Sequence, residues 1–126
     1  MKSPRLLMTS GSLVVAAAGV LAGERLPGPL EAGWKDEPVC ELVHDGLKQR
    51  VLRCTFPPGI GHERHRHAPH TGYVLEGGRT QITDGDGTRV VETRAHSSWH
   101  SDGIEWHEVV NVGDTPTSYL IIEPRN

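Results

Sequence analysis

The chain has 126 residues, a formal net charge of −3 at pH 7, 5% aromatic residues, 15 glycines and 9 prolines. This length predicts a single domain, and the mild acidity argues against nucleic acid as a partner, because phosphate binding relies on clustered Lys and Arg. Abundant Gly and Pro with few aromatic residues favour turns and short strands over helices.

Residues 1–22 have the layout of a secretory signal peptide. Lys2 and Arg5 precede an apolar, small-residue run over residues 13–22, with a potential cleavage site at Ala22. This run is shorter than the roughly 18 or more apolar residues of a typical membrane span. We therefore expect cleavage near Ala22, a secreted or periplasmic location and no stable membrane insertion afterwards. A retained N-terminal membrane anchor is the alternative.

Residues 23–38 and 39–126 differ in pattern and are predicted to be separate segments. The first segment holds three prolines and three glycines without a repeating apolar pattern, which predicts an extended N-terminal arm. From residue 39 onward, short apolar runs of β type alternate with turn signals. Strong hairpin signals stand at Asp45-Gly46 and across residues 84–87, and the chain is also expected to fold back at Gly77-Gly78.

The second segment is predicted to be an all-β domain. No window places apolar residues at helical spacing for several turns, so little helix is expected. Turn signals recur about every 8–12 residues, which favours a β-sandwich or a β-barrel. A small antiparallel domain that closes on itself hides its strand edges, so we favour a barrel.

Cys40 and Cys54 are the only cysteines of the chain. In an exported protein such a pair can form a disulfide, and one closing a loop of this length contributes about 3 kcal/mol of stability. Both residues also alternate with leucines, so they can equally face the core as small apolar groups. The sequence leaves these two interpretations open. A zinc role is not expected, because the pair lacks C-x-x-C spacing.

Histidines are concentrated in residues 62–70, where four of the eight stand. His65 and His67 are two residues apart, so on a strand their side chains leave the same face and can meet one metal ion. Pro69 marks a bend or bulge, after which His70 can turn toward the same point. The alternative for each histidine is a surface or a structural role.

A fourth candidate, His107, stands far along the chain on a predicted late strand. In a closed barrel, strands distant in sequence meet across the interior. We therefore predict a mononuclear metal site whose ligands are His65, His67, His70 and His107.

The histidine motifs resemble those of the cupin family. Gly59, five residues and then His65-Arg66-His67, with Gly77 further on, resemble the first cupin signature, and His107 and Asn111 resemble the end of the second. The likeness covers residues 39–124. It implies a single-domain, all-β jelly-roll barrel of six to eleven strands with little helix, and a metal site inside it.

The sequence departs from the cupin pattern in three respects. His70 stands six residues before Gly77, where cupins usually carry a metal-binding Glu, and the spacer after His67 is one residue short. In the second motif, the usual Gly and Pro positions hold His96 and Asp102. We expect the turn in the second motif to be rebuilt.

The exchange of Glu for His affects which metal is expected. Four neutral imidazoles leave the charge of a divalent ion uncancelled, and such a site suits Zn, Cu, Ni or Fe(II) better than Mg or Ca. Loading outside the cytoplasm favours Zn or Cu, whereas the cupin resemblance favours Fe, Mn or Ni. Among these metals we favour Zn slightly as the bound ion. A cationic metal with open positions binds anionic substrates and acidifies bound water.

Other polar and aromatic residues are given secondary roles. Among the histidines outside the predicted ligand set, His62 is expected to have no role in the site, with a place at its mouth as the alternative. His100 is expected to be structural or to support the ligands, and His44 and His96 to lie at the surface. Large aromatic residues are more often core or pocket wall than chemistry, which applies to Tyr73, Trp99 and Trp106. Two carboxylates, Glu76 and Glu105, are either exposed strand residues or proton acceptors near the site. Arg66 should point away from the ligand pair.

Three functions are compatible with these features. The first is a metal-dependent enzyme for a small, anionic organic substrate, of the dioxygenase, isomerase or cyclase class known for cupins. The second is a cupin that binds metal or a small ligand without turnover. The third, a surface histidine cluster without a site, is disfavoured by the second-motif match at His107 and Asn111. The resemblance also implies a homodimer, which no feature of the sequence demonstrates.

Overall fold

The computed structural model describes residues 25–125, which form eleven β-strands and contain no helix. The strands are β1 Gly33–Trp34, β2 Glu37–Pro38, β3 Cys40–Asp45, β4 Gln49–Phe56, β5 Gly61–His67, β6 His70–Glu76, β7 Gly78–Asp84, β8 Gly87–Thr93, β9 Ser98–Ser101, β10 Ile104–Asn111 and β11 Thr117–Pro124. Within this part of the chain no helix is long and apolar enough to cross a membrane. The predicted signal peptide at residues 1–22 lies outside the described residues.

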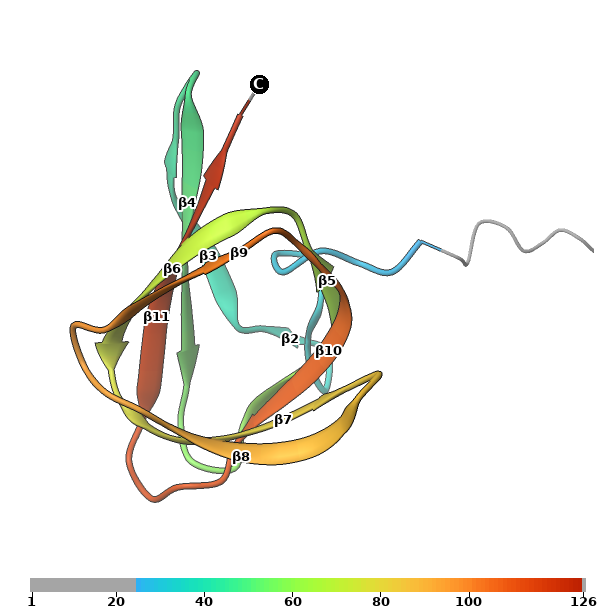
Figure 1. Ribbon diagram of the computed structural model, residues 1–126, viewed down its shortest axis with the longest axis vertical. Helices are drawn as coiled ribbons and strands as arrows, with labels where there is room; N and C mark the ends of the chain where they lie inside the picture. Colours follow the sequence, from blue (N-terminus) through green and yellow to red (C-terminus); the bar gives the residue numbers. More distant parts are fainter. Residues whose placement is uncertain (1–24, 126) are drawn as a thin grey trace, which may run out of the picture.

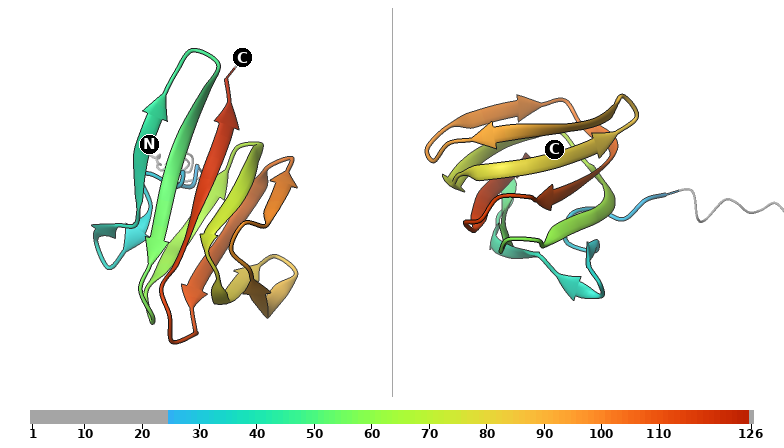
Figure 2. Two further views of the ribbon diagram at one scale, coloured as in Figure 1. Left: turned by 90° about the vertical axis from the view of Figure 1, so that its left-hand side faces the viewer. Right: turned by 90° about the horizontal axis from the view of Figure 1, so that it is seen from below.

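Two antiparallel sheets curl around a common interior and form a jelly-roll barrel (Figure 1). One sheet has five strands in the order β3-β4-β11-β6-β9, whose outer face is seen in the left view of Figure 2. The other has four strands in the order β5-β10-β7-β8, and β1 pairs with β2 in a separate hairpin. The predicted all-β jelly-roll fold with little helix is confirmed.

The expected fold-back at Gly77-Gly78 is a crossing between the two sheets and not a hairpin. β6 pairs with β11 and β9, whereas β7 pairs with β10 and β8. Gly77 passes so close to the backbone of Thr93 that a β-carbon there would overlap its carbonyl group. By contrast, the two predicted hairpins exist, since β3 pairs with β4 and β7 with β8.

The core lies where the inner faces of the two sheets meet. Leu52 and Ile121 are fully buried and occupy directly opposed positions on β4 and β11. Their neighbours in the core include Phe56 and Val109. Each fully buried side chain of this size contributes about 1.5–3 kcal/mol relative to an exposed one.

Both interpretations of the cysteines hold at once. Cys40 and Cys54 face each other directly across β3 and β4 and are joined by a disulfide. Both are also buried within the hydrophobic core. The disulfide therefore cross-links β3 and β4 on the side of the hairpin that faces the core.

The N-terminal segment, residues 25–38, is fastened to β5. The backbone N–H and the Nε of Arg66 donate to the carbonyl oxygens of Pro27 and Leu26, at 3.0 and 3.1 Å. The segment also contains a hydrogen-bonded turn from Gly28 to Ala32, followed by the β1–β2 hairpin. β5 is an edge strand of its sheet, so this segment covers backbone groups that would otherwise be unpaired.

Two residues of the cupin-like motifs shape the backbone next to the histidines. Asn111 is buried, and its side-chain amide donates to the carbonyl oxygens of Phe56 and Thr115, each at 2.8 Å, while its Oδ1 accepts from the N–H of Gly113. Gly59 has φ +82°, and the hydrogen bond from Ile60 N–H to Pro57 oxygen closes the turn around it. A turn with Pro followed by a residue of positive φ favours Gly at the latter position.

Candidate metal centre

Strands β5 and β10 bring three histidines together on the inner face of the barrel. The register of these antiparallel neighbours places His107 opposite His65, and His67 leaves the same face of β5 as His65. The Nε2 atom of His65 consequently lies 2.9 Å from that of His67 and 3.1 Å from that of His107. One ligand nitrogen from each residue lies within 4.8 Å of the other two.

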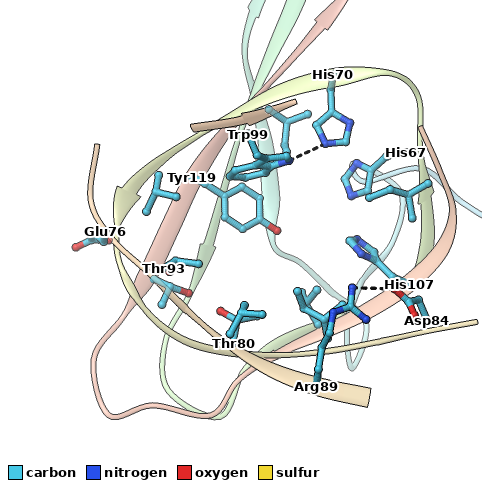
Figure 3. Close-up of a pocket in the computed structure, with 17 residues that line it drawn as sticks. His67, His70, Glu76, Thr80, Asp84, Arg89, Thr93, Trp99, His107 and Tyr119 are labelled. Atoms are coloured by element: carbon cyan, nitrogen blue, oxygen red, sulfur yellow. Dashed lines mark hydrogen bonds and ion pairs between the residues drawn. The ribbon is translucent and has the colours of Figure 1, made fainter. Parts of the chain in front are cut away.

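Local backbone irregularities aim His107 into this group. The pairing of β10 with β5 shifts register on both sides of His107, between Ile104 and His107 and again between His107 and Val109. Such bulges increase strand twist and redirect side chains, and they are frequent beside functional sites. The side chains of His67 and His107 lie near each other at one end of the cavity described below (Figure 3).

Hydrogen bonding fixes the proton position on His65. Its Nδ1–H donates to the backbone oxygen of Glu63 at 2.6 Å, so in the neutral ring the Nε2 atom carries a lone pair directed at His67 and His107. A metal-ligating histidine usually anchors its other ring nitrogen in this way. The Nδ1 atom of His67 is buried without a partner among the described residues.

Burial keeps these histidines neutral. It lowers the pKa of His65 from 6.5 to about 4. Burial together with repulsion from the neighbouring imidazoles lowers the pKa of His107 to about 3 and that of His67 to about 2. Neutral imidazole is the form that binds a metal, so the group is ready to do so at pH 7.

The donor set fits a divalent transition metal. A tetrahedral zinc ion with Zn–N bonds of about 2.0–2.1 Å separates its ligand nitrogens by about 3.3 Å. The two Nε2–Nε2 distances from His65 are 2.9 and 3.1 Å, so a small outward movement of the rings would admit an ion. Three neutral nitrogen donors suit Zn, Fe, Ni or Cu and not Mg or Ca, which require oxygen ligands.

His70 lies beside this group and is not one of its three members. Its ring is buried, with its centroid 4.8 Å from that of His67. Its Nδ1–H donates to the oxygen of Ala68 at 2.8 Å, and its Nε2 accepts from the indole N–H of Trp99 at 3.3 Å. Both ring nitrogens thus have protein partners, and the role of His70 as a fourth ligand stays a prediction.

His62 has a structural position and is not among the residues that line the cavity. It is completely buried, and its Nε2–H is shared between the carbonyl oxygens of Pro29 and Ala32, at 3.1 and 3.2 Å. Its ring stacks on that of His65, with the centroids 3.7 Å apart. His62 therefore ties the N-terminal segment to β5 and supports a member of the three-histidine group from behind.

The remaining histidines lie away from the centre. His44, His96 and His100 are exposed. His96 adopts φ +72° in a turn, and its Nδ1 pairs with the hydroxyl of Tyr73 at 2.9 Å. A position of positive φ normally favours Gly, which is the residue that cupins usually carry there. His96 therefore takes a positive-φ conformation at the position where the cupin pattern has Gly.

The aromatic and acidic residues differ in placement. Trp99 lines the cavity, whereas Trp106 packs beneath the guanidinium of Arg64, 4.0 Å from its ring centroid. Glu76 also lines the cavity and accepts a hydrogen bond from Ser118. Glu105 is exposed and does not line it.

A cavity of about 320 Å³ extends from the histidines between the two sheets (Figure 3). Strand alternation supplies its walls, because every second residue of β7, β8 and β11 faces inward. Seven of the 17 lining residues are apolar, namely Val74, Ile82, Val91, Trp99, Ile104, Val109 and Ile121. His67 and His107 lie at one end (Figure 3), so a molecule bound in the cavity would contact the histidine group.

Three ionisable residues of the cavity wall did not emerge from the sequence: Asp84, Arg89 and Tyr119. Asp84 and Arg89 form an ion pair of 3.0 Å, and the hydrogen bond from Arg89 lowers the pKa of the Asp84 carboxyl. Burial raises the pKa of Tyr119, so its hydroxyl stays protonated. The one available signal was the period of two along β8, which places Arg89 on the same face as Val91 and Thr93.

Solved structures with the same fold come from several bacteria. A cupin domain from Bordetella pertussis Tohama I has a TM-score of 0.66 and 21% sequence identity, and the match covers 81% of this chain and 98% of that one. A conserved protein with a double-stranded β-helix domain from Klebsiella pneumoniae has a TM-score of 0.57 and 21% identity, covering 73% and 81% of the two chains. The polyketide cyclase RemF from Streptomyces resistomycificus has a TM-score of 0.56 and 20% identity, covering 75% and 73%.

At this level of identity these likenesses show the fold alone. A search of curated proteins finds no match. The model of the cupin domain family matches residues 52–123. That range contains both histidine-bearing strands, β5 and β10. Because this match spans more than half of the chain, the protein belongs to the cupin family.

Proposed function

We propose that the protein is an exported cupin that holds one divalent transition metal on His65, His67 and His107 and binds a small anionic organic molecule beside it. The observation that carries this proposal is the convergence of three Nε2 atoms from two strands at the end of an apolar cavity. His70, next to His67, is the predicted fourth ligand. Three protein ligands would leave a coordination position open to a substrate or a water molecule.

The ion would supply positive charge and Lewis acidity at this end of the cavity. The protein's own residues would do the rest. The backbone oxygen of Glu63 holds the His65 ring in one tautomer, and the buried ring of His62 supports it from behind. The apolar walls would exclude water from a bound molecule, which strengthens its electrostatic contacts with the site.

Zinc is proposed slightly ahead of Fe, Mn, Ni and Cu. The ligands are neutral nitrogens, and the affinity order for divalent metals favours Cu and Zn where the protein is loaded outside the cytoplasm. The buried disulfide between Cys40 and Cys54 supports export, because disulfides form and persist mainly in oxidising compartments. Cleavage near Ala22 remains part of the proposal.

Catalysis of the dioxygenase, isomerase or cyclase class is proposed for the site, although the fold by itself selects no reaction. One observation favours the alternative, a cupin that binds its ligand without turnover. The two carboxylates that line the cavity are both engaged, Asp84 with Arg89 and Glu76 with Ser118. A free general base is therefore absent from the lining residues that the structure describes, unless a ligand displaces one of these partners.

A homodimer is also proposed. β3 is an edge strand of the five-stranded sheet, and Leu42 and Val43 on it are each 44% exposed. An edge strand with exposed apolar residues is a site at which a second copy can add its own strand.

The test of the metal site is elemental analysis of the full chain, expressed into the periplasm and purified without a metal-chelating step. We expect about one metal ion per chain, and its loss in His67→Ala and His107→Ala, because two nitrogen donors seldom hold a divalent ion. His44→Ala, exposed on β3, should keep the metal and serves as the matched control.

His70→Ala separates the two possible roles of His70. A metal affinity close to that of the wild type would place His70 beside the centre, and a loss equal to that of His67→Ala would make it a ligand. A wild-type protein that contains no metal as purified and binds none of added Zn, Fe, Mn, Ni and Cu would contradict the metal proposal.

A further inference from the structure

We propose that Arg89 is the group that selects the ligand of the cavity, by pairing with a carboxylate on a small ring-shaped molecule whose far side meets the Tyr119 hydroxyl. This inference deepens the proposed function and rests on it for the neighbouring metal. It is carried by the placement of Arg89, by its unused hydrogen-bond donors and by the shape and chemistry of the opposite wall.

Arg89 projects into the cavity from β8. It is paired with Ile82 of β7, and it shares the inner face of β8 with Val91 and Thr93, which also line the cavity. In Figure 3 its side chain rises from the cavity floor toward His107 and Asp84. The side chain is 51% exposed, so it borders the opening as well as the interior and can exchange partners without unfolding its surroundings.

Most of the guanidinium has no protein partner. A guanidinium carries five N–H donors in a planar fork. Among the described residues, the hydrogen bond from Nη2 to Oδ2 of Asp84 is the contact that Arg89 makes with another side chain. Asp84 thus accepts a hydrogen bond from one N–H of the guanidinium, and the remaining N–H donors are available to a ligand. A carboxylate is the group that matches two such donors at once.

The charges of the lining also favour an anion. Asp84 balances Arg89, Glu76 is the other carboxylate of the lining, and imidazoles that ligate a metal are neutral. A divalent ion on the histidines would therefore leave the cavity with excess positive charge. A ligand carboxylate next to Arg89 would offset that excess charge at the side of the cavity that borders its opening.

The opposite wall fits a flat apolar body with one polar group. The rings of Trp99 and Tyr119 meet edge to face, with centroids 5.4 Å apart, and border the cavity. The Tyr119 hydroxyl points into the cavity (Figure 3), and no protein hydrogen bond to it exists among the described residues. A buried phenol hydroxyl normally has a partner, so this donor is available to a ligand.

Size limits the ligand. The cavity volume of about 320 Å³ lies at the lower end of the range of about 300–1,000 Å³ found for small-molecule sites. One six-membered ring with a carboxylate and a short polar substituent is the class of ligand that these observations favour. Extended polymers and multi-ring molecules would have to leave part of their surface outside.

The experiment uses two probes of equal shape, benzoate and the neutral benzamide, titrated calorimetrically into the zinc-loaded full chain. We expect benzoate to bind wild type about tenfold or more tightly than benzamide, the usual size of a charge-assisted hydrogen-bond contribution. Arg89→Gln should lower the benzoate affinity by that factor and abolish the preference. Tyr119→Phe should leave the affinities for both probes unchanged, because neither carries a polar group on the far side of its ring. It should weaken 4-hydroxybenzoate, whose hydroxyl would face Tyr119, by about three- to tenfold, because one neutral hydrogen bond is lost.

Arg79→Gln is the matched control. Arg79 stands on the adjacent strand β7, pairs with the carboxylate of Glu92 and does not line the cavity. Its replacement should leave the affinities for both probes unchanged. Metal content and thermal melting are measured for every variant, so that lost metal and lost folding are separated from lost anion binding. Should Arg89→Gln not fold, Arg89→Lys replaces it, with an expected partial loss of the preference for benzoate.

Several results would overturn the proposal. They are equal affinity of the wild type for benzoate and benzamide, no benzoate binding at millimolar concentration, or unchanged benzoate affinity in the metal-loaded Arg89→Gln variant. If the wild type holds no metal, the proposed function fails separately, and the same two probes are titrated into the metal-free protein. A preference for benzoate that depends on Arg89 would then still support this inference, and its absence would contradict it.

Discussion

The buried histidines differ in which ring nitrogen is already used, and this difference assigns their roles. The Nδ1–H of His65 donates to a backbone oxygen, and its Nε2 is directed toward His67 and His107. The Nε2–H of His62 donates to two carbonyl oxygens of the N-terminal segment. Both ring nitrogens of His70 are hydrogen-bonded to protein groups. Five neighbouring imidazoles can therefore serve in metal binding, in fastening the chain and in shaping the cavity wall.

The depressed histidine pKa values predict an acid-sensitive metal-free protein. The pKa of His62, His65, His67 and His107 falls from 6.5 to about 4 or below on folding, chiefly because of burial. Below pH 6.5 the unfolded chain binds more protons than the folded one, so stability is present above that pH and is lost as the pH falls toward 4. We expect a loss of about 1 kcal/mol for each histidine between pH 7 and 5.5.

Urea denaturation of the metal-free protein at both pH values measures this effect. His62→Gln should show a smaller loss than the wild type, since one buried imidazole is gone, whereas His44→Gln, at an exposed position, should not. A free energy of unfolding that is the same at pH 7 and 5.5 would contradict the argument.

At the scale of the elements, β6 and β9 together build the aromatic wall of the cavity. Their register pairs Gly72 with Trp99, and the indole lies over the glycine so closely that a β-carbon there would overlap the ring. The same indole donates to His70 at the start of β6. One glycine thus sets the orientation of Trp99, and through it the position of His70.

Gly72→Val tests this dependence. The added side chain would displace the Trp99 ring, and we expect a loss of about 1–3 kcal/mol of stability, as is usual for overpacking, together with a changed tryptophan fluorescence spectrum. Gly85→Ala is the control, because its β-carbon would meet no atom within 4 Å, and it should leave both measurements unchanged. A Gly72→Val protein with wild-type stability and fluorescence would show that Trp99 is free to move.

At the scale of the whole molecule, two kinds of link hold the barrel in shape. The disulfide of Cys40 and Cys54 ties β3 to β4 within one sheet. Asn111, on β10 of the other sheet, reaches the carbonyl oxygen of Phe56 at the end of β4. The barrel can therefore leave part of its interior open as a cavity while its two sheets remain in register.

Asn111→Ala should destabilise the whole molecule without touching the histidine group. Three hydrogen bonds of a buried side chain would be lost, and the carbonyl oxygens of Phe56 and Thr115 would lose their partner. We expect a cost of about 3 kcal/mol, read from urea denaturation, with metal content unchanged in the folded fraction. Asp114→Ala, exposed in the same turn, should cost little, and equal stabilities of the two variants would refute the role assigned to Asn111.

The sequence by itself determined the fold class and the two segments that carry the histidines. Alternation with a period of two and frequent turn signals are local properties, and they predicted strands and little helix without tertiary information. The spacing of His65 and His67 likewise placed both rings on one face of a strand. The motifs that resemble those of cupins predicted that His107 and Asn111 belong to the same site region as β5. No local sequence pattern predicts that proximity.

Only the tertiary structure decided how these residues are used. The crossing at Gly77, the choice of Trp99 as partner for His70 and the inward direction of Arg89 and Tyr119 depend on which strands become neighbours. That pairing is set by contacts between residues far apart in the chain, which propensity and spacing do not record. The disulfide was undecided for the same reason, since Cys40 and Cys54 can bond only because the β3–β4 register brings them face to face.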